Sequence, residues 1–322
     1  MNSLRLPFAP ILLLLALVTT ACSGSDGAST SIPSLTRTPI ADGITLTDFL
    51  GREVTVPRNP GKVVALSPTT VELVYAVGGT VVGRASSADY PPEAQSVPDV
   101  GTSYQPNIEK IIALQPDLVI ADSQIQPELK DQVDTIGAPV MFVGAGVFAD
   151  VPKALRLVGL ATGHDDAGEA AATGLEQHLA KLQAAIQHTH PKVLIVNGTP
   201  DDFFAATPAS YVGDLNQLLG GRNAAEGQPT VGRFPGYAKL STEAILATDP
   251  DIIFAISAVK LGDETISDRL KADPAWSSLA AVKAGRVHEI DYREFLIAPG
   301  PRVGEALDTL FRLLYPGATL PS

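Results

Sequence analysis

The stretch RNPGKVVALSPTTVELVYAVG, from Arg58 to Gly78, decides how the rest of the chain is interpreted. Its short apolar run Val63–Leu66 is bounded by turn residues, which indicates a strand buried on both faces of a parallel sheet. Ser67 can cap a helix, Pro68 suits the first helical position, and the helix ends at the glycine. Open α/β sheets bind ligands where a strand leads straight into a helix N-terminus, so this corner is a candidate binding region. An ordinary β–α corner of a doubly wound protein has the same pattern.

The composition is that of a globular protein with room for two domains. Of the 322 residues, 45% are hydrophobic and 18% are charged, and the formal net charge is −12. This charge argues against nucleic-acid binding, because no basic stripe is present to displace counterions from phosphates. An anionic small ligand is compatible with it, since a local arginine cluster can act inside an acidic protein.

The first 42 residues have the pattern of an export signal followed by a tether. Arg5 precedes an apolar run over 11–18, and small residues lead to Cys22, so 1–21 is expected to be a signal peptide. Cys22 is the only cysteine, and lipid attachment needs such a thiol, so we expect lipidation there and a membrane anchor. Thr19 stands where a bacterial lipoprotein signal usually has leucine, and an ordinary signal peptide with an incidental cysteine is the alternative. Residues 22–42, rich in Ser, Thr, Gly and Pro, are expected to be a flexible tether.

Residues 43–160 are expected to form an N-terminal α/β lobe with a largely parallel sheet. In chain order the expected elements are a hairpin of strands 44–48 and 53–57, the strand and helix described above, a strand over 81–83, a helix over 107–114, a strand over 118–121, a helix over 126–136, a strand over 139–143 and a helix over 151–160.

A single long backbone helix is expected to join two lobes within residues 161–190. Asp166 can cap its start with Glu169 three positions on, and Pro191 ends it. Apolar residues recur along one stripe, and a helix over 167–189 is roughly 35 Å long at the usual rise.

Residues 191–322 are expected to form a C-terminal α/β lobe. Its expected elements are strands over 192–196 and 203–206, a helix over 212–219, a helix and strand within 241–254, a helix over 273–282, a strand over 286–290 and a last helix opened by Pro301 whose buried face holds Val303, Ala306, Leu307, Leu310 and Leu314.

One unit of the second lobe repeats a unit of the first. The stretch 241–254 overlays 107–120 at a constant offset, with Glu243 matching Glu109 and a Pro-Asp pair in the same place. A helix leading into a buried strand is common, but the glutamate and the Pro-Asp pair at identical separation point to two lobes of related build.

The candidate ligand contacts are polar, aromatic and cationic residues that follow the strands. In the first lobe they are Ser67, Thr69, Tyr90 and Tyr104; in the second they are Phe234, Tyr237, Tyr292, Arg293 and Arg302. Tyrosines and arginines that face one another across a cleft suit a large, polar, partly anionic ligand. Each residue alone is better explained as a loop anchor, so the prediction is for the set and not for any one member, and Arg84 and Arg233 are further candidates.

Motifs for other chemistries are missing from the sequence. There is no Gly-x-Ser-x-Gly, no P-loop and no Gly-x-Gly-x-x-Gly after a strand, and no acid and base stand at a recognisable spacing. His188 and His190 have no carboxylate or cysteine at ligand spacing, so we expect no metal site and interpret them as a solvated helix end.

Glu109 and Glu243 each fall in the first turn of an expected helix. The helix dipole favours a carboxylate there, which explains each one without any function. As a pair on related lobes they would present two equivalent acidic corners, on which a partner with two basic pockets could dock.

Several motifs in order resemble the substrate-binding lipoproteins of ABC importers for cobalamin, ferric siderophores and haem. The similar segments, within roughly 44–316, are 63–72, 89–94, 98–101, 107–117, 220–223 and 300–302. The resemblance implies two Rossmann-like lobes bridged by one backbone helix, with the ligand in a shallow cleft and little lobe closure. It implies that Glu109 and Glu243 engage arginines of a membrane permease dimer. Glu72 lies in the opening helix and is given a structural role.

Together these features predict a monomeric, non-enzymatic receptor, lipid-anchored outside the cytoplasmic membrane, that delivers an iron complex or a corrinoid to an ABC permease. No intrinsic cofactor is expected. Arginines in the cleft favour an anionic ferric siderophore over cobalamin and haem, and Tyr104 and Tyr237 are the phenolate candidates if the cargo is haem. The alternatives are a haem receptor of the same fold, and a secreted enzyme or a sensor that uses the cleft.

Overall fold

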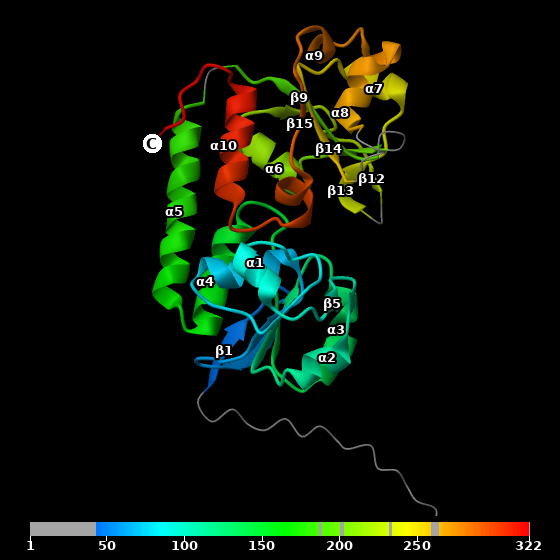
Figure 1. The fold of residues 1–322 in the computed structure, drawn as a ribbon. Coiled ribbons are helices and arrows are strands. Elements are labelled where there is room, and N and C mark those ends of the chain that lie inside the picture. Colours follow the sequence, from blue (N-terminus) through cyan, green and yellow to red (C-terminus); the bar gives the residue numbers. More distant parts are fainter. Residues whose placement is uncertain (1–42, 187–188, 200–202, 232–233, 259–263, 322) are drawn as a thin grey trace, which may run out of the picture. The chain divides into compact units, whose positions relative to one another are not determined.

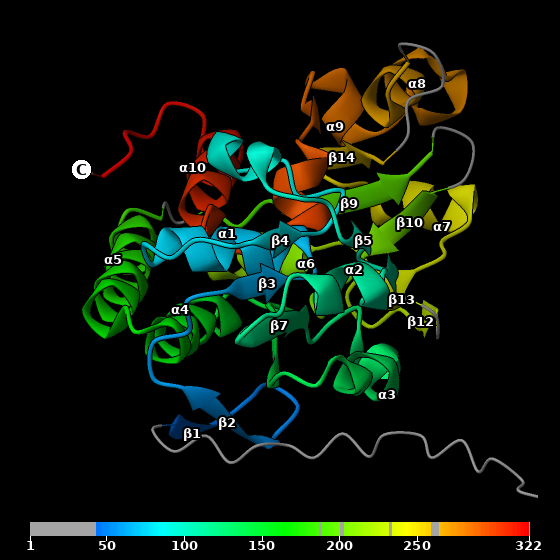
Figure 2. The ribbon, with the colours of Figure 1, turned by 60° about the horizontal axis from the view of Figure 1, so that its bottom comes forward.

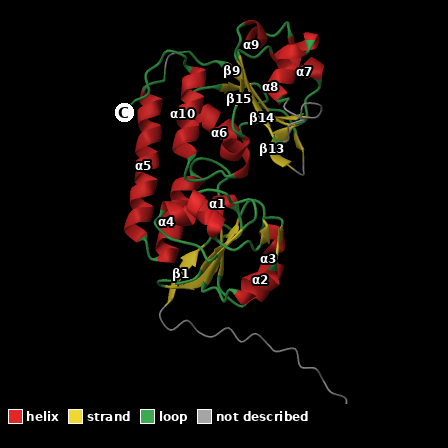
Figure 3. Ribbon diagram, viewed as in Figure 1, coloured by secondary structure: helices red, strands yellow, loops and turns green. Residues whose placement is uncertain are grey.

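The computed structural model of the chain describes residues 43–186, 189–199, 203–231, 234–258 and 264–321. Residues 38–322 belong to one compact unit, and the described strands within it form two large sheets (Figures 1 and 3). We call the part around the first sheet the N-lobe and the part around the second the C-lobe. The expected mixed α/β fold class is confirmed. The signal peptide, the tether and Cys22 lie outside the described residues.

The N-lobe sheet is parallel throughout and has the order β4-β3-β7-β8. Figure 2 labels three of its strands, β4, β3 and β7. Its strands are β3 (Val63–Ala65), β4 (Gly83–Arg84), β7 (Leu118–Asp122) and β8 (Val140–Val143). Successive residues of β3, β7 and β8 point to two different apolar cores, one with α1 and α4 and the other with α2 and α3. This explains the unbroken apolar runs in the sequence, because both faces of these strands are buried.

The N-lobe helices follow the predicted order, with one exception. They are α1 (Pro68–Ala76), α2 (Ile108–Ala113), α3 (Lys130–Val133) and α4 (Asp150–Thr162). Ser67 caps α1 through a capping box with Thr70, and Asn107 caps α2. The prediction of one continuous helix over 126–136 is wrong, since α3 is a single turn between two 3₁₀ segments. No side chain caps this turn, and the glycine at 137 ends the run with φ 82°.

Two small hairpins complete the N-lobe. Strands β1 (Gly43–Thr47) and β2 (Glu53–Pro57) pair in antiparallel fashion, as expected, and β5 (Gly101–Thr102) pairs with β6 (Gln105–Pro106). The second of these hairpins was not predicted.

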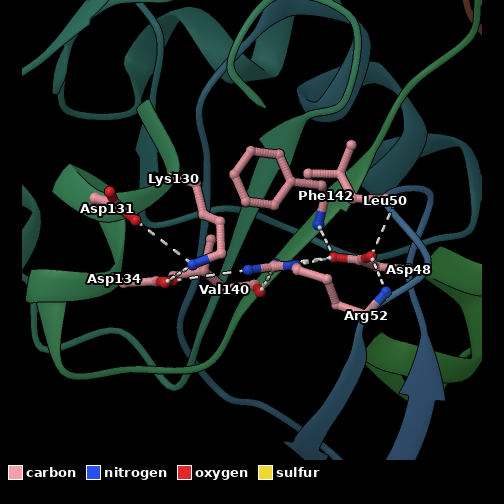
Figure 4. A network of polar contacts seen from close by, with 8 residues as sticks. All are labelled: Asp48, Leu50, Arg52, Lys130, Asp131, Asp134, Val140 and Phe142. Carbon is pink, nitrogen blue, oxygen red and sulfur yellow. Dashed lines mark hydrogen bonds and ion pairs between the residues drawn. The ribbon is translucent and has the colours of Figure 1, made fainter. Parts of the chain in front are cut away.

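A polar network fastens the first hairpin to the edge of the sheet (Figure 4). The buried carboxylate of Asp48 accepts hydrogen bonds from the backbone N–H and the Nε of Arg52 and from the N–H of Phe142 in the edge strand β8. The guanidinium of Arg52 lies 4.6 Å from the centre of the Phe142 ring and donates to the carbonyl of Val140. The hairpin therefore occupies hydrogen-bonding groups that would otherwise remain open along an edge strand.

The long helix α5 spans Asp165–Ala184 and is shorter than the expected 167–189. Its N-cap is His164, without a side-chain cap bond, so the capping box of Asp166 and Glu169 is wrong. Glu169 instead accepts from Arg156 of the neighbouring helix α4 at 2.8 Å, and this competing ion pair explains why it does not reach back to the cap. Close packing of α4 on α5 needs the glycine at 168, where a Cβ would lie 2.7 Å from the carbonyl of Leu155.

The C-lobe sheet has the order β12-β13-β10-β9-β14-β15, with β11 paired to β9. Its strands are β9 (Lys192–Gly198), β10 (Phe203–Ala206), β11 (Arg222–Asn223), β12 (Thr230–Val231), β13 (Phe234–Ala238), β14 (Ile252–Ser257) and β15 (Val287–Glu289). Strands β9, β14 and β15 are parallel, whereas β10, β13 and β12 are antiparallel to their neighbours. The antiparallel part is a difference from the expected largely parallel sheet.

The C-lobe helices are α6 (Tyr211–Leu218), α7 (Thr242–Thr248), α8 (Ile266–Ala272), α9 (Ala280–Lys283) and α10 (Val303–Leu314). The predicted buried face of α10 is confirmed, and α10 packs beside α5 in both Figure 1 and Figure 2. The single helix expected over 273–282 is wrong, because Pro274 starts a 3₁₀ turn and α9 begins only at Ala280. Helix α8 was not predicted.

The repeated unit of the sequence is also repeated in hydrogen bonding. In the N-lobe, Oδ2 of Asp117 accepts from the N–H of Lys62 at 2.9 Å, just before β3. In the C-lobe, Oδ2 of Asp251 accepts from the N–H of Lys192 at 2.7 Å, at the start of β9. In each lobe this Pro-Asp carboxylate ties the end of the repeated helix to the adjacent parallel strand. The aspartate therefore has the same structural role in both copies.

Candidate ligand-binding site

A cavity of about 550 Å³ is lined by residues of both lobes. From the N-lobe these are Pro68, Ser87, Thr102, Ser103, Tyr104 and Ile125. From the C-lobe they are Asn197, Gly198, Phe204, Tyr237, Leu296 and Ile297. The volume is in the range typical of small-molecule sites. The sequence predicted a binding region at strand ends; Asn197 and Gly198 are the last two residues of β9, and Ile125 lies three residues after the end of β7.

The N-lobe wall is formed largely by the tip of the β5–β6 hairpin. Tyr104 at this tip is 71% exposed, an unusually large fraction for an aromatic side chain, whereas the neighbouring Ser103 is only 4% exposed. The hydroxyl oxygen of Ser103 is buried and has no hydrogen-bond partner among the described residues. The backbone carbonyl of Ser103 accepts a hydrogen bond from the side chain of Gln126 at 2.7 Å.

The C-lobe wall combines strand ends with an apolar segment. Tyr237 lies in β13, opposite Ala206 of β10, and burial raises the pKa of its phenol to about 12. Asn197 lies near the end of β9, and its Oδ1 is buried without a partner in the described part of the chain. Leu296 and Ile297 belong to the π-helical turn Arg293–Ile297. The wall therefore offers apolar surface, one phenol and one amide.

The lining residues named above include no acidic or basic side chain. Lys239, whose ammonium lies 5.8 Å from the centre of the Phe204 ring, is not a lining residue. Apolar and aromatic walls with a few hydroxyl and amide groups suit a large ligand with apolar faces. A fully charged ligand would lose hydration here without gaining a counter-ion from these residues.

Two predicted ligand contacts, Ser67 and Thr69, are buried away from the cavity. They are 0% and 2% exposed, and neither is a lining residue. Ser67 donates to Oδ2 of the buried Asp122 at 2.8 Å and accepts from the N–H of Thr70. Burial raises the pKa of Asp122. Their neighbour Pro68 takes the place at the cavity wall that was expected for them.

Two other predicted contacts, Arg302 and Tyr90, belong to a junction between the lobes. Nε and Nη2 of Arg302 each donate to the Glu72 carboxylate at 2.8 Å, and the guanidinium lies 4.5 Å from the centre of the Tyr90 ring. Glu72, in α1, is 4% exposed. These residues border a separate cavity of about 470 Å³. Arg302, which was expected to meet an anionic ligand, therefore pairs with a carboxylate of the protein. Glu72 has the structural role of holding this arginine at the junction.

Arg293 and Tyr292 also lie outside the lining of the main cavity. Nη1 of Arg293 pairs with Asp89 of the N-lobe at 2.6 Å, and the ring of Tyr292 packs against the core. The further candidate Arg84 donates to backbone carbonyls of its own loop, including that of Ala94. Of the nine predicted contacts, the structure brings together Tyr104 and Tyr237. The side chains of Phe234 and Arg233 lie outside the described part of the chain.

Glu109 and Glu243 lie in the first turns of α2 and α7, as predicted, and both are exposed. Hydrogen bonds from its own backbone N–H and from the Ser241 hydroxyl hold the pKa of Glu243 below its ordinary value. In both Figure 1 and Figure 2, α2 and α7 lie on the side of this unit away from α5. Each lobe therefore presents one carboxylate on an equivalent helix.

Two further features bear on other functions. Among the described residues, no group of three or more His, Cys, Asp or Glu side chains is arranged to hold a metal ion. None of the described helices combines the length and the apolar character that crossing a membrane requires.

The chain is similar to substrate-binding proteins along most of its length. The chain is 28% identical over 314 residues, covering 94% of it and 95% of the relative, to the uncharacterized ABC transporter substrate-binding lipoprotein YvrC of Bacillus subtilis. It is 28% identical over 296 residues, 87% of each chain, to the Fe(3+)-citrate-binding protein YfmC of the same organism. The crystal structure of Staphylococcus aureus IsdE complexed with heme matches with a TM-score of 0.68 and 25% identity, covering 79% of this chain and 98% of that one. The periplasmic binding protein family matches residues 63–294, and the chain belongs to this family.

Proposed function

We propose that this protein is the substrate-binding component of an ABC importer and that it carries an iron complex in the cavity between its lobes. The observation that carries the proposal is the cavity itself, to which each lobe contributes six lining residues. Membership of the periplasmic binding protein family supports it, as do relatives named for ABC transport and for ferric citrate. The protein would act without catalysis, outside the cytoplasmic membrane and anchored through lipid on Cys22.

The lining favours iron complexes with apolar faces over compact anionic ones. The arginines that suggested an anionic ferric siderophore pair with Glu72 and Asp89 instead. A neutral ferric trihydroxamate fits such a lining, and so does haem if its carboxylates point out to water. The phenols of Tyr104 and Tyr237 are available as oxygen ligands or hydrogen-bond donors.

Absorbance titration tests the cargo class, because each candidate has its own visible spectrum. Purified protein is titrated with ferric haem, a ferric trihydroxamate, ferric citrate and cobalamin. We expect saturable spectral shifts with haem or the trihydroxamate, and weakening on Tyr237→Phe. Tyr75→Phe, outside the cavity, is the matched control. Binding of ferric citrate alone would contradict the argument from the lining, and binding of none would contradict the proposed function.

We further propose that Glu109 and Glu243 dock on basic sites of a permease dimer. The support is their exposure, their identical position in the repeated unit and the placement of α2 and α7 on one side of the unit. The double variant Glu109→Arg/Glu243→Arg should abolish uptake of labelled cargo in cells while leaving its affinity unchanged. The control variant Glu53→Arg/Glu226→Arg reverses two other exposed glutamates. It has the same net charge as the first double variant and should leave uptake intact. Equal uptake by both double variants would rule out this docking mode.

A further inference from the structure

The buried side chain of Gln126 connects three separate segments of the N-lobe behind the cavity wall. Its Oε1 accepts from the N–H of Asp122 at 2.6 Å, at the end of β7. Its Nε2 donates to the carbonyl of Leu66 at 2.9 Å, just after β3, and to the carbonyl of Ser103 at 2.7 Å, in the hairpin tip. The residue is 0% exposed. It therefore links the ends of two central strands to the segment that carries Tyr104.

The geometry leaves little choice of side chain at this position. A glutamine amide has two N–H donors, and both are used on carbonyls that face the same buried space. A carboxylate would set oxygen against oxygen at both contacts, and an apolar side chain would leave two buried carbonyls and one buried N–H without a partner. Only a neutral amide of this length satisfies all three groups.

The segment held by Gln126 carries three lining residues, including the 71% exposed Tyr104. Strands β5 and β6 have two residues each, and their tip contributes Thr102, Ser103 and Tyr104 to the cavity. A two-stranded hairpin of this size has little stability of its own. The tip has an internal bond from the N–H of Gln105 to Thr102 Oγ1, while the bond from Gln126 fixes it to the sheet.

We propose that Gln126 is a positioning residue for cargo binding: it holds the Ser103–Tyr104 tip against the cavity so that the exposed ring of Tyr104 meets the cargo in one place. This rests on the proposed function only in that the cavity takes a ligand. Gln126 itself does not line the cavity, and it acts through the tip. An exposed aromatic side chain on a fixed support binds without first losing backbone freedom, which favours tight binding.

A double-mutant cycle on the dissociation constant tests the positioning role of Gln126. The probe is ferric haem, or a ferric trihydroxamate if the wild type binds that complex and not haem. Tyr104→Ala and Gln126→Met should each raise the dissociation constant about tenfold, the effect of one important contact. In the Tyr104→Ala background, Gln126→Met should change it less than about twofold, because the group it positions is gone. Asn216→Leu, which removes another fully buried amide, in the C-lobe, controls for lost stability and should leave binding unchanged. Independent, additive effects of the two substitutions would overturn the proposal.

Hydrogen exchange supplies a readout that needs no cargo. In Gln126→Met the amides of residues 103–105 should exchange at least about tenfold faster, while those of β3 and β7 keep most of their protection. Unchanged exchange in the tip would overturn the proposal even if binding is weaker. If the wild type binds neither haem nor the trihydroxamate, the argument from the lining fails, and if it binds none of the four complexes, the proposed function fails. In either case the exchange experiment still decides whether Gln126 holds the tip.

Discussion

Replacing Arg302 by methionine removes one half of a buried ion pair that joins the lobes. The side chains of Arg302 and Glu72 are 20% and 3% exposed, and two hydrogen bonds of 2.8 Å connect them. Methionine keeps much of the apolar length but leaves the Glu72 carboxylate buried without a counter-ion. Breaking a buried pair in this way costs about 3–5 kcal/mol of the free energy of unfolding.

Urea denaturation followed by circular dichroism measures this loss. A comparable surface contact is the control: Arg156 pairs with Glu169 and Glu176, whose side chains are 60% and 46% exposed, so Arg156→Met should cost no more than about 1 kcal/mol. The double variant Glu72→Met/Arg302→Met should recover most of the loss, because two apolar side chains can replace a buried pair without leaving a charge behind.

The pH dependence provides a second check on the same variant. Without the guanidinium, the buried Glu72 carboxyl should hold its proton more tightly in the folded state than in the unfolded chain. A raised folded-state pKa means that stability is lost as the pH rises, so the deficit of Arg302→Met should be smallest below about pH 4 and largest at neutral pH. A loss under about 1 kcal/mol, or a double variant as unstable as the single one, would refute the reasoning. Weaker cargo binding at unchanged stability would instead make Arg302 a ligand contact.

Two further predictions concern stability. Asp48→Ala removes the acceptor of several hydrogen bonds at the first hairpin and should lower the free energy of unfolding, measured with urea, by about 3 kcal/mol. The control Thr45→Ala, on the exposed face, should lower it by under about 0.5 kcal/mol, and equal losses would contradict the network's role. Burial raises the pKa of Glu294 to about 7, and one of its oxygens has no partner among the described residues, so its charged form destabilises the folded state as the pH rises through 7. Glu294→Gln should therefore raise the free energy of unfolding by about 1 kcal/mol at pH 8, allowing for partial exposure, and leave it unchanged at pH 4. The same gain at both pH values would show that titration is not the cause.

Local signals in the sequence predicted local structure well. Ser67 and Pro68 specify the start of α1 within a few residues, so no distant contact is needed to place it. The Pro-Asp pairs mark the repeated unit because each aspartate has one fixed hydrogen-bonding role. The prediction for Asp166 and Glu169 failed because Arg156, on another helix, offers Glu169 a charged partner.

The site was harder to predict because its chemistry depends on distant pairings. An arginine in a sequence is a candidate ligand for any anion, and nothing near Arg302 indicates that Glu72 already neutralises it. Asn197 and Ile297 are ordinary residues that line the cavity only because two lobes meet. The predicted tyrosines divide in the same way: Tyr104 and Tyr237 line the cavity, whereas Tyr90 stacks with Arg302 and Tyr292 packs against the core.

The contacts between the lobes also determine how the cavity can respond to cargo. A movement that separates Arg302 from Glu72 while α1 keeps the carboxylate buried would leave that charge unpaired, and a cost of about 3 kcal/mol or more keeps such a state below about 1% of molecules. A second link, from the N–H of Phe148 to Asp214 of α6 at 2.7 Å, opposes the same motion. The cavity is therefore largely formed before cargo arrives, and affinity is not reduced by a preceding closure step. With the frame held in this way, we expect the spacing of Glu109 and Glu243, the carboxylates proposed for docking, to change little on loading. A permease that distinguishes loaded from empty protein would then have to detect the cavity mouth, where Tyr104 is exposed, rather than a movement of the two carboxylates.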